Sequence, residues 1–349
     1  MKDKKIFITG NEAMGLAAIK AGCKFYAGYP ITPQNELTAF MARELPKAGG
    51  VFVQAESELA AINMIIGAAS VGARCMTSSS SPGISLKQEG ISYIAGMQLP
   101  CLIINVMRGG PGLGNIAPSQ SDYFQATKGG GHGDYRLIVL APNSVQEAYD
   151  LVILGFNLAD KYRNPTMILL DAMLGQMSES VILKKPKILK VKKDWKIDIK
   201  KDRPQRIIRS FFIKEGFLEK HNLILKRKYE RIKKKEQRAQ DYRTQDAKIL
   251  IVSFGSQSRI SKEAVEILRK KGIKAGLFRP ITLWPFPEDS LKRISKKVKF
   301  ILVVEQNFGQ MVEDVRLAIR DKKPVYFFGR AGGGIPTATQ IVNFIKKLL

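Results

Sequence analysis

The segment VFVQAESELAAINMIIGAASVGARCMTSSSSPGISL, residues 51–86, carries twice the pattern that decides the fold. A short β-rich run, VFVQAES and then RCMTSSS, passes each time directly into a run with helical character. The same alternation of strands and helices extends from residue 4 to about residue 180. Apolar strands separated by helices indicate a mainly parallel sheet that is covered on both faces. We therefore predict one α/β domain over residues 1–180.

The alternation stops after residue 180 and resumes at residue 247. We predict that residues 181–245 form a basic connecting segment with one helix around residues 215–242. The tyrosines and leucines of that helix would form its apolar face, and its lysines would face water. Because strands and helices alternate again further on, residues 246–349 are predicted to form a second, smaller α/β domain.

The positive charge of the chain is concentrated in the connecting segment. Of the formal net charge of +26, the stretch from Lys184 to Lys248 carries +15, with 24 Lys and Arg against 9 Asp and Glu. A solvated connecting segment, adapted to high temperature or to acidic protein partners, is the simpler interpretation. A basic nucleic-acid-binding α/β protein is an alternative, which we do not favour because no zinc-finger spacing or RNA-reader motif accompanies the charge.

The cysteines and histidines argue against a metal centre in this chain. Cys23, Cys75 and Cys101 stand singly, and an odd number of distant cysteines does not suit a disulfide framework, a zinc site or an iron-sulfur cluster. We expect three buried, reduced thiols and no bound metal.

The first residues do not resemble a cleaved signal, and no apolar run is long enough for a membrane span. The predicted location is therefore the cytoplasm, without a membrane partner.

In open parallel sheets, ligands bind at the carboxyl ends of the strands. Four such ends carry unusual residues, in the ranges 28–33, 54–58, 77–83 and 108–115. The first lies in FYAGYPITPQ, residues 25–34, where prolines 30 and 33 each fix one backbone torsion and restrict the residue before them. Rigid backbone at a strand end loses little entropy when a ligand binds.

Two charged residues at strand ends are candidates for ligand binding. Arg108 follows the apolar run CLIINVM and precedes glycines, so its guanidinium suits a carboxylate or phosphate. It could equally extend from the sheet end into water. Glu58 precedes an almost uncharged helix, where it could serve in proton transfer or simply complement the helix dipole. Glu56 competes for the latter role.

Other glycine- and serine-rich motifs do not by themselves identify a ligand or a reaction. The run TSSSSPG, residues 77–83, could be a simple turn with Pro82 at the helix start, or its amides and hydroxyls could hold a polar ligand ring. The loop GGPGLGN lacks the GxGxxG spacing of a dinucleotide site and does not lead into a helix. The sequence has neither a P-loop nor a GxSxG motif.

Several separated motifs together resemble one family, the α subunits of the 2-oxoacid:ferredoxin oxidoreductases, and most of all the 2-oxoisovalerate type. They are listed here in chain order: GNEAMGLAAIKAGCKFYAGYPITPQNEL, AESELAAINMIIGAASVGAR, MTSSSSPGISL, INVMRGGPGLGN, QSDYFQATKGGGHGDYRLIVLAPNSVQEAYDL, FRPITLWPFP, LVVEQNFGQMVEDV and GRAGG. The similarity extends from about residue 6 to the C-terminus, and the basic segment is its least diagnostic part.

The resemblance implies a pyrimidine-type, doubly wound domain that binds thiamine diphosphate, followed by a transketolase C-terminal-like α/β domain. It also implies partners. A β subunit would hold the diphosphate and Mg²⁺, and [4Fe-4S] clusters would lie in that subunit and in a ferredoxin-like δ subunit, beside a γ subunit. None of these metals would be bound by this chain.

The resemblance assigns roles to individual residues. Glu58 matches the glutamate that hydrogen-bonds the aminopyrimidine ring of thiamine diphosphate. Thr32 and Arg108 match the pair that contacts the carboxylate and 2-oxo oxygen of the substrate. The backbone of Pro30 and Ile31 would approach the cofactor. Ser80 and Ser81, from the serine run, would also bind it.

The implied reaction is the CoA-dependent oxidative decarboxylation of a 2-oxo acid to an acyl-CoA and CO₂, with electrons passed to ferredoxin. A branched-chain acid such as 2-oxoisovalerate is favoured. Pyruvate and 2-oxoglutarate are alternative substrates, and a thiamine-dependent decarboxylase that works without ferredoxin is an alternative enzyme.

Overall fold

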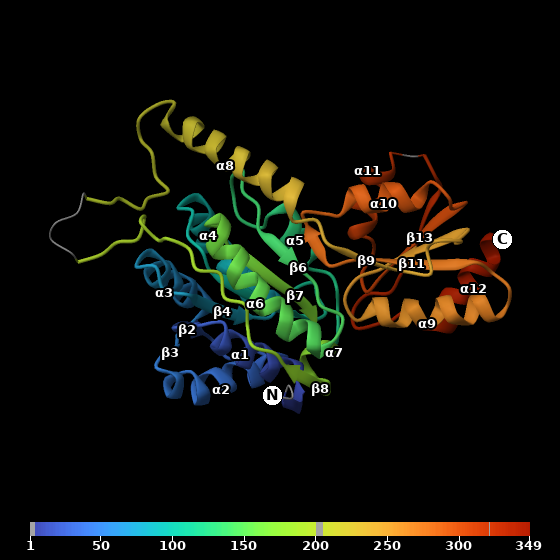
Figure 1. Cartoon of the computed structure of the whole chain (residues 1–349), viewed down its shortest axis with the longest axis horizontal. Coiled ribbons are helices and arrows are strands. Elements are labelled where there is room, and N and C mark those ends of the chain that lie inside the picture. The colour runs from blue at the N-terminus through green and yellow to red at the C-terminus, as the bar shows by residue number, and fades with distance from the viewer. Residues whose placement is uncertain (1–3, 200–204, 321) are drawn as a thin grey trace.

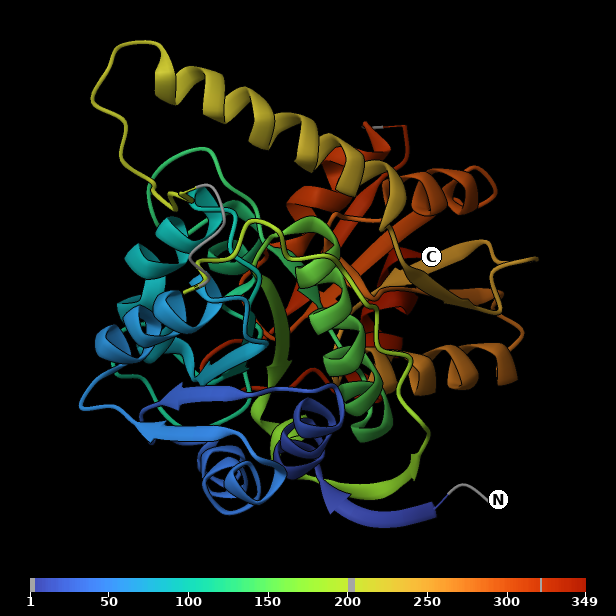
Figure 2. The same ribbon diagram turned by 60° about the vertical axis from the view of Figure 1, so that its left-hand side comes forward.

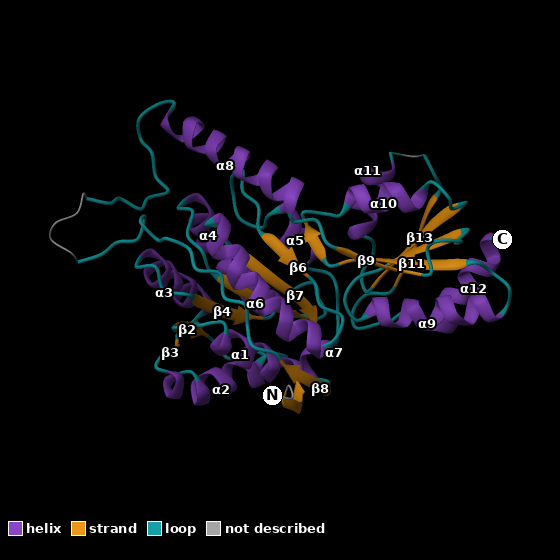
Figure 3. Cartoon of the chain, in the orientation of Figure 1, coloured by secondary structure: helices purple, strands orange, loops and turns teal. Residues whose placement is uncertain are grey.

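The computed structural model describes residues 4–199, 205–320 and 322–349, which form two α/β parts lying side by side (Figure 1). Residues 1–3 and 200–204, which belong to the predicted first domain and connecting segment, lie outside the described residues, as does residue 321. In both parts helices flank the main sheet (Figure 3).

The first part is built on a seven-stranded sheet with the order β12-β6-β7-β5-β4-β2-β3. All neighbours from β6 to β3 are parallel, and only β12 is antiparallel to its neighbour, β6. This confirms the predicted doubly wound parallel sheet. Its strands are β2 (Phe25–Gly28), β3 (Val51–Gln54), β4 (Cys75–Ser79), β5 (Leu102–Met107), β6 (Ile138–Leu140), β7 (Thr166–Asp171) and β12 (Thr282–Trp284).

Helices cover this sheet in two groups. Helix α1 packs against α2 and α6, and helix α3 packs against α4. Strands β4, β5 and β7 lie between the layers and are buried along their whole length, which explains why their sequences are apolar or small throughout. The helices of this part are α1 (Gly10–Lys20), α2 (Asn35–Glu44), α3 (Glu58–Ser70), α4 (Ser81–Gly96), α5 (Tyr123–Lys128), α6 (Val145–Tyr162) and α7 (Ala172–Gln176), with a 3₁₀ turn over Pro46–Ala48.

Side-chain caps set where some of the helices begin. The hydroxyl of Ser57 accepts a hydrogen bond from the amide of Ala60 and so starts α3. Helix α6 begins after Ser144, whose hydroxyl accepts from the amide of Glu147 at 3.1 Å. The cap at Ser57 puts Glu58 in the first turn of α3, at the carboxyl end of β3.

Strand β1 (Lys4–Thr9) does not join the parallel sheet, although the alternation of strands and helices begins with it. It pairs antiparallel with β8 (Ser178–Leu183) in a separate two-stranded sheet. Ile6 and Ile8 pack against the core, whereas Phe7 is 77% exposed. A strand with only one apolar face is suited to such a half-covered ribbon and not to the middle of a parallel sheet.

The second part contains a five-stranded sheet with the order β14-β13-β10-β11-β9. Its strands are β9 (Ala239–Tyr242), β10 (Ile249–Val252), β11 (Ala275–Pro280), β13 (Phe300–Glu305) and β14 (Val325–Gly329), and its helices are α9 (Gln257–Lys270), α10 (Glu288–Ser295), α11 (Met311–Ile319) and α12 (Ala338–Leu348). Four of the strands are parallel, and β9 is antiparallel at the edge. The predicted second α/β fold is therefore confirmed.

The connecting segment spans both parts. After β8 the chain runs out along the first part and returns as α8 (Phe217–Lys235), the helix expected there, which lies across the top of the molecule (Figure 2). Strand β9, from this segment, completes the second sheet, and β12, from beyond residue 246, extends the first sheet. The two parts thus exchange strands at their junction. The domain boundaries at residues 180 and 246 stay predictions.

Candidate active site

The four predicted strand ends meet at one edge of the main sheet. The chain passes from β2 outward to β3 and then returns to the other side of β2 to form β4. Such a reversal opens a crevice at the carboxyl ends of the strands. Thr32 follows β2, Glu58 follows β3, Ser80 follows β4 and Arg108 follows β5. The topology therefore gathers the predicted site residues around this crevice.

Glu58 is buried at the carboxyl end of β3, with 5% of its surface exposed. Its Oε1 atom accepts a hydrogen bond from the Ser79 hydroxyl at 3.4 Å. Its competitor in the sequence, Glu56, is exposed. A buried carboxyl has a strong preference for a specific hydrogen-bonding partner, whereas an exposed one is satisfied by water. The geometry therefore favours Glu58 over Glu56 as the functional carboxyl.

Gly83, in the first turn of α4, lets this helix approach Glu58. A Cβ atom at Gly83 would lie 2.0 Å from Ser79 Oγ and 2.4 Å from Glu58 Oε1, so no larger residue fits without displacing one of them. The sequence suggested Pro82 as a helix-start residue, which it is, but gave no reason for the glycine beside it. The glycine is needed for the close approach of α3 and α4.

The two serines predicted to contact the cofactor differ in their hydrogen bonding. Ser80 is fully buried, and its hydroxyl has no partner in the described structure. The Ser81 hydroxyl donates to Asp122 Oδ2 at 2.6 Å and accepts from the Arg108 amide at 3.0 Å. Ser80 thus has a free polar group for a ligand, whereas the Ser81 hydroxyl fastens the helix start to the next strand.

Ser81 is held by an acid, Asp122, which was not predicted from the sequence. Asp122 also accepts a hydrogen bond from Asn105 Nδ2 at 2.8 Å. Burial raises the pKa of Asp122, while the hydrogen bonds from Ser81 and Asn105 oppose this shift. Asp122 lies before the short helix α5, outside every motif considered as a site, so only the fold could bring it here.

Arg108 is 7% exposed and holds two loops together. Its Nη1 atom donates to the carbonyl oxygen of Thr32 at 3.0 Å, and Nη2 donates to that of Leu113 at 3.1 Å. Its Nε atom is buried and has no partner in the described structure. The alternative of an arginine extending into water is therefore wrong, because this guanidinium is buried and retains a free donor for an anionic group.

The loop that follows Arg108 depends on glycine at one position. Gly114 has a φ of +64°, and a Cβ there would lie 1.7 Å from the carbonyl oxygen of Gly109. Only glycine therefore allows the chain to fold back on itself. The loop continues through Asn115, whose side-chain amide donates to the carbonyl of Gly332 at 3.1 Å, so it also contacts the second part of the molecule.

Around Thr32 the backbone is partly exposed. Pro30 is exposed, and Ile31 and Thr32 are half-buried. The Thr32 hydroxyl accepts a hydrogen bond from Asn35 Nδ2 at 3.2 Å. Thr32 is thus held on both sides, its hydroxyl by Asn35 and its carbonyl by Arg108.

A network of buried side-chain hydrogen bonds beneath this loop was not predicted from the sequence. Gln34 is fully buried, and its Oε1 atom accepts hydrogen bonds from Ser78 Oγ at 2.6 Å and from Thr38 Oγ1 at 3.1 Å. The hydroxyl of Tyr26 bonds to the same two side chains, at 2.7 and 3.0 Å. A possible signal was the glutamine that directly follows the rigid ITP motif. The network ties the loop after β2 to β4.

The cysteines are three buried free thiols, as predicted. Burial raises the pKa of Cys23 and of Cys101 to about 12, which keeps both thiols protonated and unreactive near neutral pH. Within the described residues, no group of three or more His, Cys, Asp or Glu could hold a metal ion. Among the described helices, none is both long and apolar enough to cross a membrane.

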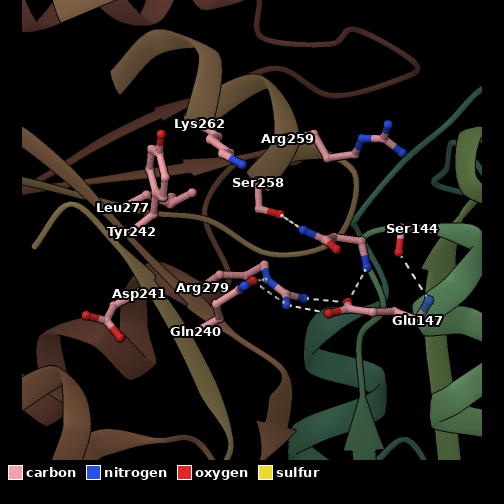
Figure 4. A pocket seen from close by; sticks show the side chains of 11 residues that line it. Ser144, Glu147, Gln240, Asp241, Tyr242, Ser258, Arg259, Lys262, Leu277 and Arg279 are labelled. Carbon is pink, nitrogen blue, oxygen red and sulfur yellow. Dashed lines mark hydrogen bonds and ion pairs between the residues drawn. The ribbon is translucent and has the colours of Figure 1, made fainter. Parts of the chain in front are cut away.

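A separate cavity of about 490 Å³ lies at the junction between the two parts (Figure 4). The guanidinium of Arg279 is 2% exposed there and binds both carboxylate oxygens of Glu147, at 2.7 and 2.8 Å, and the Gln240 side chain. These protein partners take up the charge of the arginine. We therefore interpret this region as a junction between domains and not as the active site.

Several lysines of the basic connecting segment bind groups elsewhere in the chain. Lys193 pairs with Asp160 at 2.9 Å, and Lys233 pairs with Glu288 at 2.9 Å. Lys228 is buried and donates to the carbonyl of Arg163 at 3.1 Å. These contacts fasten the segment to both parts of the chain, which is a structural role that does not need nucleic acid.

Comparison with known proteins first defines the class. The family described as "Pyruvate flavodoxin/ferredoxin oxidoreductase, thiamine diP-bdg" matches residues 16–244, and "Pyruvate:ferredoxin oxidoreductase core domain II" matches residues 247–341. The split gene transketolase, inactive beta4 tetramer, shares the fold with a TM-score of 0.63 at 15% identity, over 97% of each chain. The protein is thus an α/β protein with a thiamine diphosphate-binding domain.

The relatives define the family within this class. The ketoisovalerate oxidoreductase subunit VorB of Methanothermobacter marburgensis is 46% identical, over 98% of this chain and 97% of its own length. The 2-oxoglutarate synthase subunit KorA of Methanocaldococcus jannaschii is 39% identical, over 94% and 95%. The chain belongs to the family of 2-oxoacid:ferredoxin oxidoreductase subunits, as the resemblance indicated.

A solved structure in this family has nearly the same fold. The 2-oxoglutarate:ferredoxin oxidoreductase from Magnetococcus marinus, with 2-oxoglutarate, coenzyme A and succinyl-CoA bound, matches with a TM-score of 0.90 and 29% identity. The match covers 99% of this chain and 65% of that chain. The present chain thus spans about two thirds of that relative.

Proposed function

We propose that this chain is the α subunit of a thiamine-diphosphate-dependent 2-oxoacid:ferredoxin oxidoreductase, in which it forms the aminopyrimidine side of the active site. The reaction is the CoA-dependent oxidative decarboxylation of a 2-oxo acid to an acyl-CoA and CO₂, with electrons passed to ferredoxin. The observation that carries the proposal is a buried carboxyl, Glu58, hydrogen-bonded to Ser79 at the end of β4 in a domain that matches a thiamine diphosphate-binding family. The next residue, Ser80, has a buried hydroxyl without a partner among the described residues.

The residues of the crevice fit the aminopyrimidine end of the cofactor. Among the described residues the Ser80 hydroxyl has no partner, and Gly83 lets the start of α4 pack closely against Glu58. When bound, thiamine diphosphate supplies the carbanion that attacks the 2-oxo carbon and accepts the electrons released by decarboxylation. The carboxyl of Glu58 would exchange a proton with the aminopyrimidine ring nitrogen. The backbone of Pro30 and Ile31 would form the rigid wall of the site.

Arg108 and Thr32 would orient the substrate. The free Nε donor of Arg108 can bind the carboxylate of a 2-oxo acid, and the Thr32 hydroxyl can donate to the 2-oxo oxygen. Since the guanidinium is already held by Thr32 and Leu113, it is oriented before the substrate arrives. A carboxylate held in this way is neutralised in the ground state, and its loss as CO₂ is driven by the cofactor.

A branched-chain 2-oxo acid such as 2-oxoisovalerate is the proposed substrate. The support is the 46% identity to ketoisovalerate oxidoreductase subunits, against 39% to a 2-oxoglutarate synthase subunit. An apolar pocket discriminates between substrates by only about 1–3 kcal/mol per methylene, so pyruvate and 2-oxoglutarate belong in the same assay.

The remaining parts of the enzyme would come from partner subunits. A β subunit would hold the diphosphate and Mg²⁺, and a γ subunit and a ferredoxin-like δ subunit would complete the assembly. The three cysteines of this chain are too few for a [4Fe-4S] cluster, which agrees with placing the clusters in the partners. The relatives are themselves named as subunits. A cytoplasmic location completes the proposal.

The test is to co-express the chain with its partner subunits and measure reduction of ferredoxin or a viologen dye that depends on the 2-oxo acid and on CoA. We expect turnover, fastest with 2-oxoisovalerate. An assembled complex with intact clusters and bound thiamine that turns over none of the three acids would overturn the proposal. Release of CO₂ from the 2-oxo acid without CoA and without reduction of ferredoxin or dye would favour a simple decarboxylase.

A further inference from the structure

One motif of the second part has no role in the proposed reaction, although it contributed to the family resemblance. This motif, LVVEQNFGQMVEDV, covers residues 302–315 and leads from the end of β13 into α11. Glu305 is fully buried and accepts hydrogen bonds from the Asn307 side chain at 3.0 Å and from the Met311 amide at 2.8 Å. The loop between strand and helix is therefore tied to both of them.

This loop contacts a short segment of the first part, residues 119–124. The Gln120 amide donates to the carbonyl oxygen of Gln306 at 3.0 Å, and the Gln306 amide donates to the Gln120 side chain at 3.1 Å. The Asn307 side chain donates to the Gln120 carbonyl at 2.8 Å. All three residues are at most 1% exposed, and buried polar groups need such partners. The position of the segment thus depends on the second part.

Gln310 holds the same segment on both sides of Asp122. Its Nε2 atom donates to the carbonyl oxygen of Ser121 at 2.7 Å, and its Oε1 atom accepts from the Phe124 amide at 2.8 Å. One side-chain amide therefore binds the backbone before and after Asp122. The course of the chain at Asp122 is thus set by a residue of the second part.

The side chain of Asp122 connects this segment to α4 and β5. Its Oδ2 atom accepts hydrogen bonds from Ser81 Oγ at 2.6 Å and from Asn105 Nδ2 at 2.8 Å. Ser81 Oγ in turn accepts from the Arg108 amide at 3.0 Å. Hydrogen bonds to a carboxylate are roughly twice as strong as those between neutral groups. A continuous chain of hydrogen bonds therefore leads from Gln310 through Asp122 and Ser81 to Arg108.

The same stretch of chain also contacts Arg108 at its other end. Arg108 forms an antiparallel bridge with Pro118, and the Gly109 amide donates to the carbonyl oxygen of Ala117 at 3.0 Å. Residues 117–124 thus extend from the backbone of Arg108 to the loop of the second part. A shift of this stretch would move the Arg108 backbone, and its guanidinium with it.

We propose that Asp122 and Gln310 are positioning residues for the substrate, because they set where Arg108 lies at the end of β5. This proposal rests on the proposed function, in which Arg108 binds the carboxylate of the 2-oxo acid. It adds a role for the second part of the chain, which acts on the substrate through the backbone of Arg108. A displacement of a binding group by a fraction of an ångström is enough to weaken binding.

The test uses the assembled complex with Asp122→Ala, Gln310→Ala or both. Hydrogen exchange, followed by mass spectrometry on a peptide that contains Arg108, measures how firmly the Arg108 amide is bound. We expect this amide to exchange at least about tenfold faster in both single variants, because its bond opens more often. Steady-state kinetics should show a rise of about 5- to 20-fold in KM for the 2-oxo acid, with a smaller change in kcat.

The double variant tests whether Gln310 acts through Asp122. If it does, the double variant should raise KM no further than Asp122→Ala alone, because residues in one hydrogen-bonded network are not additive. Fully additive effects would refute the proposed connection. Asp122→Asn keeps the oxygen that accepts both bonds but loses its charge, so it should lie between wild type and Asp122→Ala in both measurements.

Tyr123→Phe is the matched control. Tyr123 belongs to the same segment, and its hydroxyl donates to Asp314 of α11 at 2.6 Å. The substitution removes a hydrogen bond between the two parts but none of the bonds that lead to Arg108. We expect lower resistance to urea unfolding, with KM and exchange at Arg108 unchanged.

The outcomes separate the two proposals. If the wild-type complex turns over no 2-oxo acid, the proposed function fails, and exchange at Arg108 alone decides whether Asp122 and Gln310 hold it. If the wild type is active and both alanine variants keep its KM, the positioning role is refuted. An equal rise of KM in Tyr123→Phe would refute it too, since any loosening between the parts would then suffice. Failure of every Asp122 and Gln310 variant to assemble would assign both residues to the fold alone and would also refute it.

Discussion

The guanidinium of Arg108 donates a hydrogen bond of 3.0 Å to the carbonyl oxygen of Thr32, across 76 positions of the sequence. The bond joins the loops that follow β2 and β5, the two segments predicted to contact the substrate. The side chain that would bind the carboxylate is thus held by the backbone of the residue that would bind the 2-oxo oxygen. Their separation is set before any ligand arrives.

Replacing Arg108 should mainly weaken substrate binding. In Arg108→Ala, both the free Nε donor and the contacts that hold the loops are lost. Since hydrogen bonds to charged groups contribute about 1.5–3 kcal/mol, we expect KM for the 2-oxo acid to rise roughly 10- to 100-fold, with a smaller change in kcat. Steady-state kinetics of the assembled complex measures this. Arg43→Ala, an exposed arginine on α2, is the control and should leave KM unchanged.

Replacing Glu58 should mainly slow turnover. In Glu58→Gln the shape of the side chain is kept but no proton can be exchanged, so we expect kcat to fall by about 10²- to 10⁴-fold while thiamine diphosphate still binds. The control is Glu56→Gln, two residues earlier and exposed. Equal rates for the two variants would remove Glu58 from its assigned role.

A methyl group at Gly83 should disturb the site without removing any functional group. In Gly83→Ala the new Cβ would collide with Ser79 and Glu58, so one of them must move. We expect the affinity for thiamine diphosphate to drop by at least about tenfold, since a shift of 1.4 kcal/mol suffices for that. Calorimetry measures the affinity.

Gly67→Ala serves as the control for this substitution. Gly67 lies on α3, and a Cβ there meets no heavy atom within 4 Å. Because alanine favours a helix more than glycine does, this variant should gain about 0.5–1 kcal/mol of stability and keep its affinity for thiamine diphosphate. Loss of affinity in both variants would point to the helix itself and not to the crevice.

The ion pair at the domain junction should contribute to stability. Arg279→Met leaves the Glu147 carboxylate, which is 29% exposed, without its main partner. We expect a loss of about 2–4 kcal/mol, somewhat less than for a fully buried pair. Urea unfolding followed by the fluorescence of Trp284, on β12 at the junction, reports it. Adding Glu147→Leu should restore part of the stability, and a further loss in the double variant would contradict this interpretation.

Lys228 should make stability depend on pH above neutrality. Burial lowers its pKa to about 7 in the folded protein, against 10.5 for an ordinary lysine. Between these values the unfolded chain binds more protons, so the free energy of unfolding should rise with pH in this range by up to about 1.4 kcal/mol per unit. Below pH 7 both states carry the proton and this contribution is flat. In Lys228→Met the slope should fall by this amount, while the contribution of Lys87, whose pKa is also lowered by burial to about 7, stays. An unchanged slope would contradict the assignment.

Much of the site was predictable because local sequence determines local structure. Apolar runs between helices predicted β2, β4 and β5, and the residues that follow a strand must lie at its carboxyl end. Motif resemblance then selected Glu58, Thr32 and Arg108. The burial of Lys87, whose Nζ atom donates to the Thr77 hydroxyl and the Ser78 carbonyl, was missed. A lysine within a helix is normally exposed, and nothing in SPGISLKQEGISYIAG distinguishes this one from a surface residue.

The exchange of strands at the junction could not be predicted either. Strand β12 is the short stretch Thr282–Trp284, which gives no periodic signal, and it pairs with β6 about 140 residues away. Strand β1 showed a clear strand pattern, but the pattern does not state the partner. Its pairing with β8 depends on which edges the rest of the fold leaves uncovered.

The sequence by itself determined the α/β class, the positions of the strand ends and the family, because hydrophobic periodicity, helix caps and motifs are local properties of the chain. Only the tertiary structure decided which side chains are buried and what they touch. It separated Glu58 from Glu56, enclosed Lys87 against β4 and, among the described residues, left the Ser80 hydroxyl and Arg108 Nε without partners. The reason is physical: burial and electrostatic coupling arise from groups that meet only when distant segments pack together.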